Sequence, residues 1–151
     1  MSFRNRAPLA LRQSPLGHAL PRRELNRLDQ LGTTVEIFEG EQIIRSASPG
    51  RECFVVVDGQ FKVVGSDFTG TITAGEVAGE LALLTGRPRN ASVASTASSV
   101  VYALHPREFA TLLSEAPVFR SKVLRTASHR LSDSAVSLPA QLLPEHERSR
   151  A

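Results

Sequence analysis

Short apolar segments separated by turn residues fill the middle of this chain and constrain its fold more than any other feature. The clearest pair is 53–57 and 60–64, two runs rich in β-branched residues that flank Asp58 and Gly59. Asp-Gly between two such runs is typical of a type I′ turn, because glycine adopts positive φ without steric cost. The pattern therefore predicts a hairpin. Further segments of the same kind lie at 35–38, 43–44, 71–73, 91–96 and 99–104, and this spacing predicts an antiparallel sandwich or barrel.

Helical patterns lie on both sides of this region. Leu25, Leu28 and Leu31 predict a helix that begins near Pro21 and ends at Gly32. Prolines at 106 and 117 suit first helical positions and predict helices over 106–114 and 117–135. We therefore expect an α+β fold, mainly β: an antiparallel β-barrel or jelly roll with an N-terminal helix, a short helix between strands and two C-terminal helices. The last helix has an apolar face formed by Phe119, Val123, Leu124, Ala127 and Leu131.

Composition excludes several classes of protein. Among 151 residues there is one cysteine, Cys53, and no apolar run reaches the length that crosses a bilayer. A single cysteine excludes an internal disulfide framework and fits a reducing compartment, so we expect a cytoplasmic protein without a membrane segment. The four histidines are scattered, with no cluster of metal-ligand spacing. We therefore expect no metal, no cofactor and no catalytic residues.

The two ends of the chain differ from the middle. Six arginines lie among the first thirty residues, where they could contact nucleic acid or an anionic surface, or form a solvated segment. The last fifteen residues are polar, without a period, and contain two prolines. We expect a flexible basic arm over 1–19, one folded domain over 20–136 and a disordered tail over 137–151.

One run, 79–93, combines groups that bind an anion. A glycine followed by a short helical segment offers backbone N–H groups without an intrahelical partner. Glu80 supplies a carboxylate that accepts hydrogen bonds, and Arg89 supplies a guanidinium fork for phosphate oxygens. A Gly-Arg-Pro break separates the two charges, so they cannot be an i,i+4 pair of one helix. The run predicts a site for an organic phosphate with a vicinal hydroxyl; the alternative is a surface ion pair on a loop.

This run closely resembles the phosphate-binding cassette of cyclic nucleotide-binding domains. Residues 75–84 and 87–93 match that cassette in residue type and in spacing. The upstream strands and the two helices after residue 105 fall where the family has them, so the resemblance covers about residues 20–135. The family includes the regulatory subunits of cyclic-AMP-dependent protein kinase and the catabolite activator protein group.

The resemblance implies a role for each cassette residue. Glu80 would accept a hydrogen bond from the ribose 2′-hydroxyl, and Arg89 would pair with the exocyclic oxygens of the cyclic phosphate. Gly79 would let the backbone approach the ligand closely. The backbone N–H groups of three residues would complete the anion cradle; these are Leu81, Ala82 and Ala91.

The sequence departs from the usual family pattern at Ala78, at the connection between 64 and 71, and at Asn90. Ala78 stands where the family usually has a bulky aromatic residue, and the connection between 64 and 71 is short. Asn90 occupies a position where threonine favours cyclic GMP and where alanine or serine is common in cyclic-AMP binders. Its amide could donate to phosphate or to a purine edge, so both ligands stay open and we favour cyclic AMP. The last helix would cover the base, and its candidates are Leu124, Arg125 and Ser128.

The predicted function is a stand-alone cyclic nucleotide sensor without enzymatic activity, which acts by rearranging its C-terminal helices on a separate effector protein. The segment after Ser137 is too short for a helix-turn-helix, so we do not expect direct DNA binding. The apolar face of the last helix could pair two copies of the chain or pack on its own barrel. One alternative is an interaction module of the same fold that binds no ligand. A cupin-like enzyme is the other, and the absence of metal-ligand spacing disfavours it.

Overall fold

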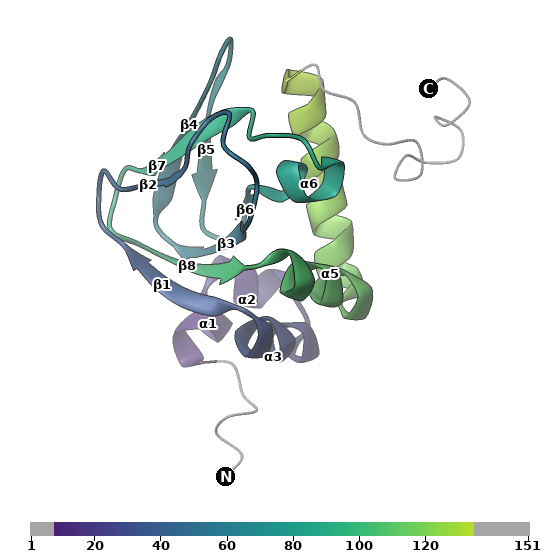
Figure 1. The fold of residues 1–151 in the computed structure, drawn as a ribbon. Helices are drawn as coiled ribbons and strands as arrows, with labels where there is room; N and C mark the ends of the chain where they lie inside the picture. Colours follow the sequence, from purple (N-terminus) through teal and green to yellow (C-terminus); the bar gives the residue numbers. More distant parts are fainter. Residues whose placement is uncertain (1–7, 135–151) are drawn as a thin grey trace, which may run out of the picture.

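The computed structural model describes residues 8–134, in which two four-stranded antiparallel sheets form a jelly-roll-like sandwich with helices against one side (Figure 1). One sheet has the order β1-β8-β3-β6, with β1 at Thr33–Ile37, β8 at Ser99–Leu104, β3 at Cys53–Asp58 and β6 at Val77–Ala78. The other has the order β2-β7-β4-β5, with β2 at Gln42–Ile44, β7 at Ala91–Ser95, β4 at Gln60–Gly65 and β5 at Thr69–Thr73. Of the two predicted architectures, the jelly roll is therefore confirmed.

The predicted hairpin at Asp58 and Gly59 is wrong. The strands before and after it exist, but β3 pairs with β8 and β6, whereas β4 pairs with β7 and β5. Gly59 has φ +110° and carries the chain from one sheet to the other. A Cβ at Gly59 would lie 1.9 Å from the hydroxyl of Ser99, so glycine is required here by close approach as well as by φ. The turn residues marked a corner between sheets, not a hairpin.

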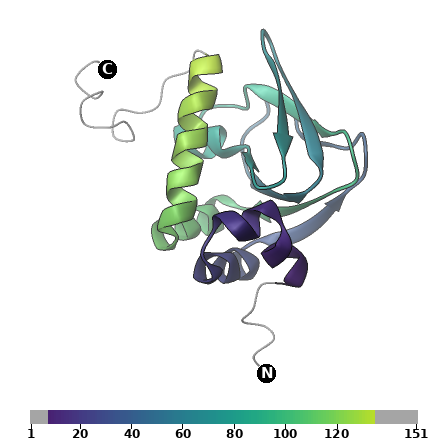
Figure 2. The same cartoon turned by 180° about the vertical axis from the view of Figure 1, so that it is seen from behind.

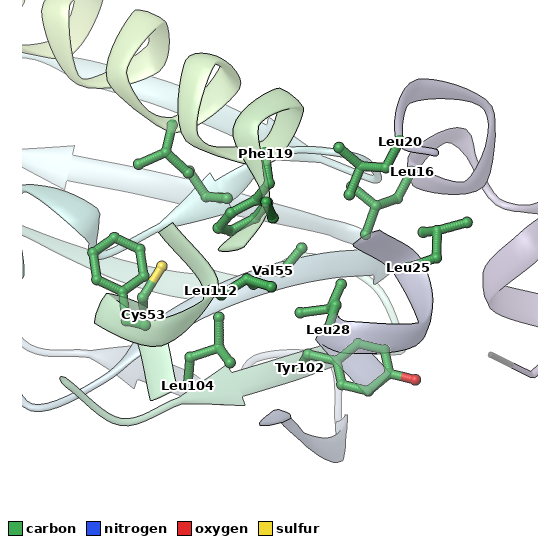
Figure 3. Packing of buried hydrophobic residues seen from close by; sticks show 14 of the residues in the cluster. Leu16, Leu20, Leu25, Leu28, Cys53, Val55, Tyr102, Leu104, Leu112 and Phe119 are labelled. Carbon is green, nitrogen blue, oxygen red and sulfur yellow. The ribbon is translucent and has the colours of Figure 1, made fainter. Parts of the chain in front are cut away.

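Two apolar cores share strand β3, which is why the sequence there is apolar without alternation. Phe54 and Val56 point into the sandwich, where they join Phe61 of β4. Cys53 and Val55 point to the opposite face, which the helices cover (Figure 3). A strand that is buried on both faces reads as a continuous apolar run.

Helices close the outer face of the β1-β8-β3-β6 sheet. The predicted helix after Pro21 is α3 (Arg22–Leu31), and the two C-terminal helices are α5 (Pro106–Glu115) and α6 (Pro117–Ser134). In α6 the predicted apolar face is buried within its own chain, since Phe119, Val123 and Ala127 are fully covered. Of the two predicted roles of this face, packing on its own domain is therefore observed, and pairing of two copies stays a prediction.

The N-terminal region differs from its prediction. Residues 9–19, expected to belong to a flexible arm, form α1 (Leu9–Gln13) and α2 (Pro15–Ala19) (Figures 1 and 2). Leu11 and Leu16 are almost completely buried in the core beneath the helices. Burial of these two apolar side chains stabilises the arm against the domain by about 1.5–3 kcal/mol each before the entropic cost. Residues 1–7 and the predicted tail, 137–151, lie outside the described residues.

Glu24 anchors the start of α6. This carboxylate is buried, and it accepts hydrogen bonds from the backbone N–H groups of Phe119 (2.8 Å) and Val118 (3.1 Å). The first turn of a helix has no intrahelical partners for its N–H groups, and an anion there also complements the helix dipole. α6 is thus held at its N-terminal end by a residue of α3, ninety-four positions earlier in the chain.

Candidate ligand-binding site

A cavity of about 440 Å³ opens between the β2-β7-β4-β5 sheet and the last helix. Its size is in the usual range for pockets that bind small organic ligands. One wall is apolar and comes from the strands, with Val63, Ile72 and Val93. The polar wall comes from the segment 79–91, which contains α4 (Glu80–Thr85), and from Arg130 of α6. The cavity therefore has one face for an apolar or planar group and one face for charged groups.

The turn at Gly79 brings the backbone close to the polar wall. Gly79 precedes α4 with φ +86°, in the left-handed region that favours glycine. A Cβ at this position would lie 2.5 Å from Nη1 of Arg89 and 2.9 Å from the carbonyl oxygen of Glu52. Both the backbone angle and the space require glycine. A side chain here would push Arg89 away from the position that it holds.

Arg89 is fixed by backbone groups. Its Nη1 donates to the carbonyl oxygen of Gly79 at 2.8 Å, and its Nη2 donates to that of Glu52 at 2.5 Å. Its own backbone is held as well, because the Arg89 N–H donates to Ser48 and its carbonyl accepts from Ala47. A guanidinium has five N–H donors, so these two contacts leave donors for an anion in the cavity. The geometry presents a positive charge in a preset orientation.

Glu80 is held differently, by an ion pair with the last helix. Nη1 of Arg130 lies 2.6 Å from one carboxylate oxygen of Glu80 and 2.7 Å from the other. The Glu80 side chain is 1% exposed, and that of Arg130 is 26% exposed. Residues fifty positions apart, on α4 and α6, thus meet at one side of the cavity.

Burial shifts the ionisation of the charged groups at the site. It raises the pKa of Glu80, while Arg130 and Arg89 oppose that shift by stabilising the carboxylate. Burial also lowers the pKa of Arg89, and the thiol of Cys53 and nearby carboxylates oppose the shift. Cys53 is fully buried next to these charges, and burial raises the pKa of its thiol. Cys53 is therefore a packed core residue of β3.

The structure brings all seven predicted cassette residues to one cavity. The residues that line it are Gly79, Glu80, Leu81, Ala82, Arg89, Asn90 and Ala91. The three candidates for covering a base are not among the lining residues. Leu124 is half-buried, whereas Arg125 and Ser128 are exposed on α6. Their role stays a prediction.

The sequence analysis missed Arg130, the one residue of α6 that lines the cavity. A signal was available, because Arg130 follows buried Ala127 by three positions and so stands at the edge of the apolar face of α6. Nothing in the sequence, however, indicates that this edge meets Glu80.

Among the described residues, no group of three or more histidine, cysteine or carboxylate side chains gathers as a metal site. None of the helices in residues 8–134 has the length and apolarity needed to span a membrane.

The jelly roll carries one cavity with an apolar wall and a charged wall, and comparison with known proteins gives the family. The model of the cyclic nucleotide-binding domain matches residues 34–116. The chain belongs to the cyclic nucleotide-binding domain family.

Individual relatives agree with this assignment. A cyclic nucleotide-gated potassium channel of Rhizobium etli is 31% identical over 91 residues, which are 60% of this chain and 26% of the channel. The chain thus spans about a quarter of the length of that curated relative. A solved structure of cAMP-bound PfPKA-R matches with TM-score 0.67 and 22% identity over 85% of this chain and 46% of that one. The catabolite activator protein of Thermus thermophilus matches with TM-score 0.66 and 20% identity, over 81% and 60% of the two chains.

Proposed function

We propose that the protein is a regulatory sensor that binds a purine cyclic mononucleotide, preferentially cyclic AMP, in the cavity beside α4. The observation that carries the proposal is the fixed guanidinium of Arg89, which two backbone carbonyls hold at the polar wall. A buried cation that already has its orientation loses little entropy when it binds an anion. This arrangement is what a ligand with one localised phosphate charge requires.

The cassette offers a partner for each part of such a ligand. Arg89 binds the exocyclic phosphate oxygens, and the N–H groups of Leu81, Ala82 and Ala91 complete the cradle. Glu80 accepts from the ribose 2′-hydroxyl. The planar base lies along the apolar wall of the sheet, where Val63 and Ile72 line the cavity. The match of residues 34–116 to the cyclic nucleotide-binding family supports these roles.

In this proposal Asn90 and the threonine hydroxyls of β5 determine which base is preferred. Asn90, Thr69 and Thr71 all line the cavity, and their polar groups offer both donors and acceptors. An Asn amide at position 90 lacks the hydroxyl that favours cyclic GMP in the family. We therefore propose cyclic AMP as the preferred ligand and cyclic GMP as the weaker one.

Ligand binding would act through the C-terminal helices. α6 reaches the polar wall through Arg130, so a change at the wall changes the position of this helix. In the bound state Leu124, Arg125 or Ser128 would cover the base. The moved helices would then present a new surface to an effector protein. No step of this mechanism requires a chemical reaction.

Thermal unfolding with three nucleotides tests the proposal. Cyclic AMP, cyclic GMP and 5′-AMP are each added up to millimolar concentration, and the midpoint of unfolding is measured. A ligand at one hundred times its Kd adds about 2.7 kcal/mol to the free energy of unfolding. We expect the largest rise with cyclic AMP and the smallest with 5′-AMP. If neither cyclic nucleotide raises the midpoint, the sensor function is refuted.

One observation favours a second function, an interaction module that binds no ligand. The carboxylate of Glu80 already has a partner within the chain, because Arg130 contacts both of its oxygens. A site whose acceptor is satisfied internally has less to gain from a ligand. Absence of any shift in the unfolding experiment would select this second function.

A further inference from the structure

The ion pair between Glu80 and Arg130 occupies the group that a ribose hydroxyl needs. We propose that Arg130 is an intramolecular competitor for Glu80, so that a ligand with a free 2′-hydroxyl must displace Arg130 and thereby release the end of α6 from α4. This inference rests on the proposed function, since it concerns regulation of the same cavity. It adds a specificity-determining residue that the cassette sequence does not contain.

The carboxylate of Glu80 is shielded from solvent. The Glu80 side chain is 1% exposed although it borders the cavity. The partner that contacts both of its oxygens is Arg130, which is 26% exposed. A ligand atom can approach the carboxylate only if a covering group moves. Among the groups at the cavity, Arg130 is the one bonded to the carboxylate itself.

The two ends of α6 are attached to the domain by different contacts. At its start the helix is fixed by Glu24, which is 2% exposed, and by Arg120, whose Nη1 donates to the carbonyl of Leu113 at 2.6 Å. Arg130 is four residues before the end of the helix, and its side chain bonds to Glu80 of α4. α6 also packs through buried Ala127 and Leu131, so opening of this link removes a polar attachment of the last turns to α4 while the apolar contacts remain.

The exchange replaces one donor to the carboxylate with another, although Arg130 contacts both carboxylate oxygens and a hydroxyl can donate to one of them. Glu80 gives up the N–H of Arg130 and accepts the 2′-hydroxyl, while the guanidinium of Arg130 turns toward solvent, where water solvates it. A 2′-deoxy nucleotide has no donor for Glu80 and leaves the pair intact. Cyclic AMP binds only those molecules in which the ion pair is open. The apparent affinity for cyclic AMP is therefore lower than the intrinsic affinity, in proportion to the fraction of molecules in which the pair is open. The pair has no such effect on the 2′-deoxy analogue.

Binding measurements on Arg130→Met test the competition. The Kd values for cyclic AMP and 2′-deoxy cyclic AMP are measured for wild type, Arg130→Met and Arg130→Lys at pH 8. We expect Arg130→Met to bind cyclic AMP about five- to tenfold more tightly than wild type, which is at the lower end of typical coupling between sites. The affinity for 2′-deoxy cyclic AMP should stay the same. Arg130→Lys keeps the charge and should lie between the other two proteins.

Lys122→Met is the matched control, because it removes the same charge from α6 at a position that does not line the cavity. It should leave both affinities unchanged. Equal or weaker binding of cyclic AMP by Arg130→Met overturns the competition while the proposed function stands. A parallel gain for both nucleotides also overturns it, since that result would reflect charge or general loosening. Failure of every protein to bind either nucleotide overturns the proposed function and the competition together.

A measurement on the wild-type protein covers the case in which Arg130→Met does not fold. The side-chain Nε–H resonance of Arg130 is assigned by its absence from the spectrum of Arg130→Lys. Cyclic AMP should move this resonance to the position of a solvated arginine, and 2′-deoxy cyclic AMP should not. A resonance that stays in place when cyclic AMP is bound would overturn the proposal.

Discussion

Two arginines border the same cavity, and they differ in what holds them. Arg89 belongs to the sandwich side and bonds to the backbone carbonyls of Gly79 and Glu52. Arg130 belongs to the helical side and bonds to the carboxylate of Glu80. Backbone carbonyls next to the paired strands β3 and β6 are held in place, whereas a side-chain carboxylate can exchange one donor for another. The difference separates a charge that the backbone fixes from one that, in the proposal, a ligand replaces.

Loss of Arg89 should have the largest effect. A hydrogen bond to a charged group contributes about 1.5–3 kcal/mol, so Arg89→Leu should weaken binding of cyclic AMP by about ten- to a hundredfold or more. Calorimetric titration measures this loss.

Because the same change leaves the carbonyls of Gly79 and Glu52 without a donor, Arg89→Leu should also lower the free energy of unfolding. Arg89→Lys separates the two effects, since it keeps a donor and the charge but loses the two-pronged geometry. Wild-type affinity in both variants would mean that the phosphate binds elsewhere.

The cradle around Arg89 can be broken at Gly79. Gly79→Ala places a Cβ in the left-handed region and 2.5 Å from Nη1 of Arg89. Gly86→Ala is the matched control, because Gly86 has φ +71° but open space around its Cβ position.

We expect Gly86→Ala to cost about 1 kcal/mol for the backbone angle alone, and Gly79→Ala to cost at least about 1 kcal/mol more. Urea unfolding of the two variants measures both costs. Equal costs would show that Arg89 moves aside freely and is not fixed.

The helical side should respond to pH through Glu80, with a smaller effect. Burial raises the pKa of this carboxyl above its ordinary value of 4.5, so the folded state binds the proton more tightly than the unfolded state. The resulting contribution to stability is complete below pH 4.5 and is lost as pH rises through the folded-state pKa. The charged groups that act on the carboxyl are Arg130 and Arg89, and both lower its pKa against the larger effect of burial.

Glu80→Gln cannot titrate at this position. Urea unfolding from pH 4.5 to 8 should therefore show wild type losing stability relative to Glu80→Gln as pH rises. A difference between the two proteins that is constant with pH would mean that Arg130 compensates the burial of the charge completely.

The sequence predicted the elements of this fold better than their pairing. Prolines at 106 and 117 located the starts of α5 and α6, and the spacing of Leu25, Leu28 and Leu31 located α3. The Asp58-Gly59 turn was read as a hairpin because the local signal is the same for a hairpin and for a corner between sheets. Its strands pair with partners far away in the chain, which no local pattern specifies.

The grouping of the cassette residues was predictable from the sequence, whereas the burial of Leu11 and Leu16 was not. Gly79, Glu80 and Arg89 lie within one run, so residue types and spacing were enough to predict that they come together, and the structure places them at one cavity. Their roles in binding stay a prediction. Leu11 and Leu16, in contrast, were assigned to a flexible arm because short helical segments have weak periodicity. Their burial depends on a surface that the rest of the fold supplies.

The sequence by itself therefore determined the chemistry of the site, because glycine, carboxylate and guanidinium act through their own geometry and charge at fixed spacing. Only the tertiary structure decided which groups hold them. Arg130 meets Glu80 because α6 packs along the domain from an anchor at Glu24. That meeting joins residues fifty positions apart. It depends on the direction of α6, and helix direction is set by packing of the whole core rather than by any local sequence.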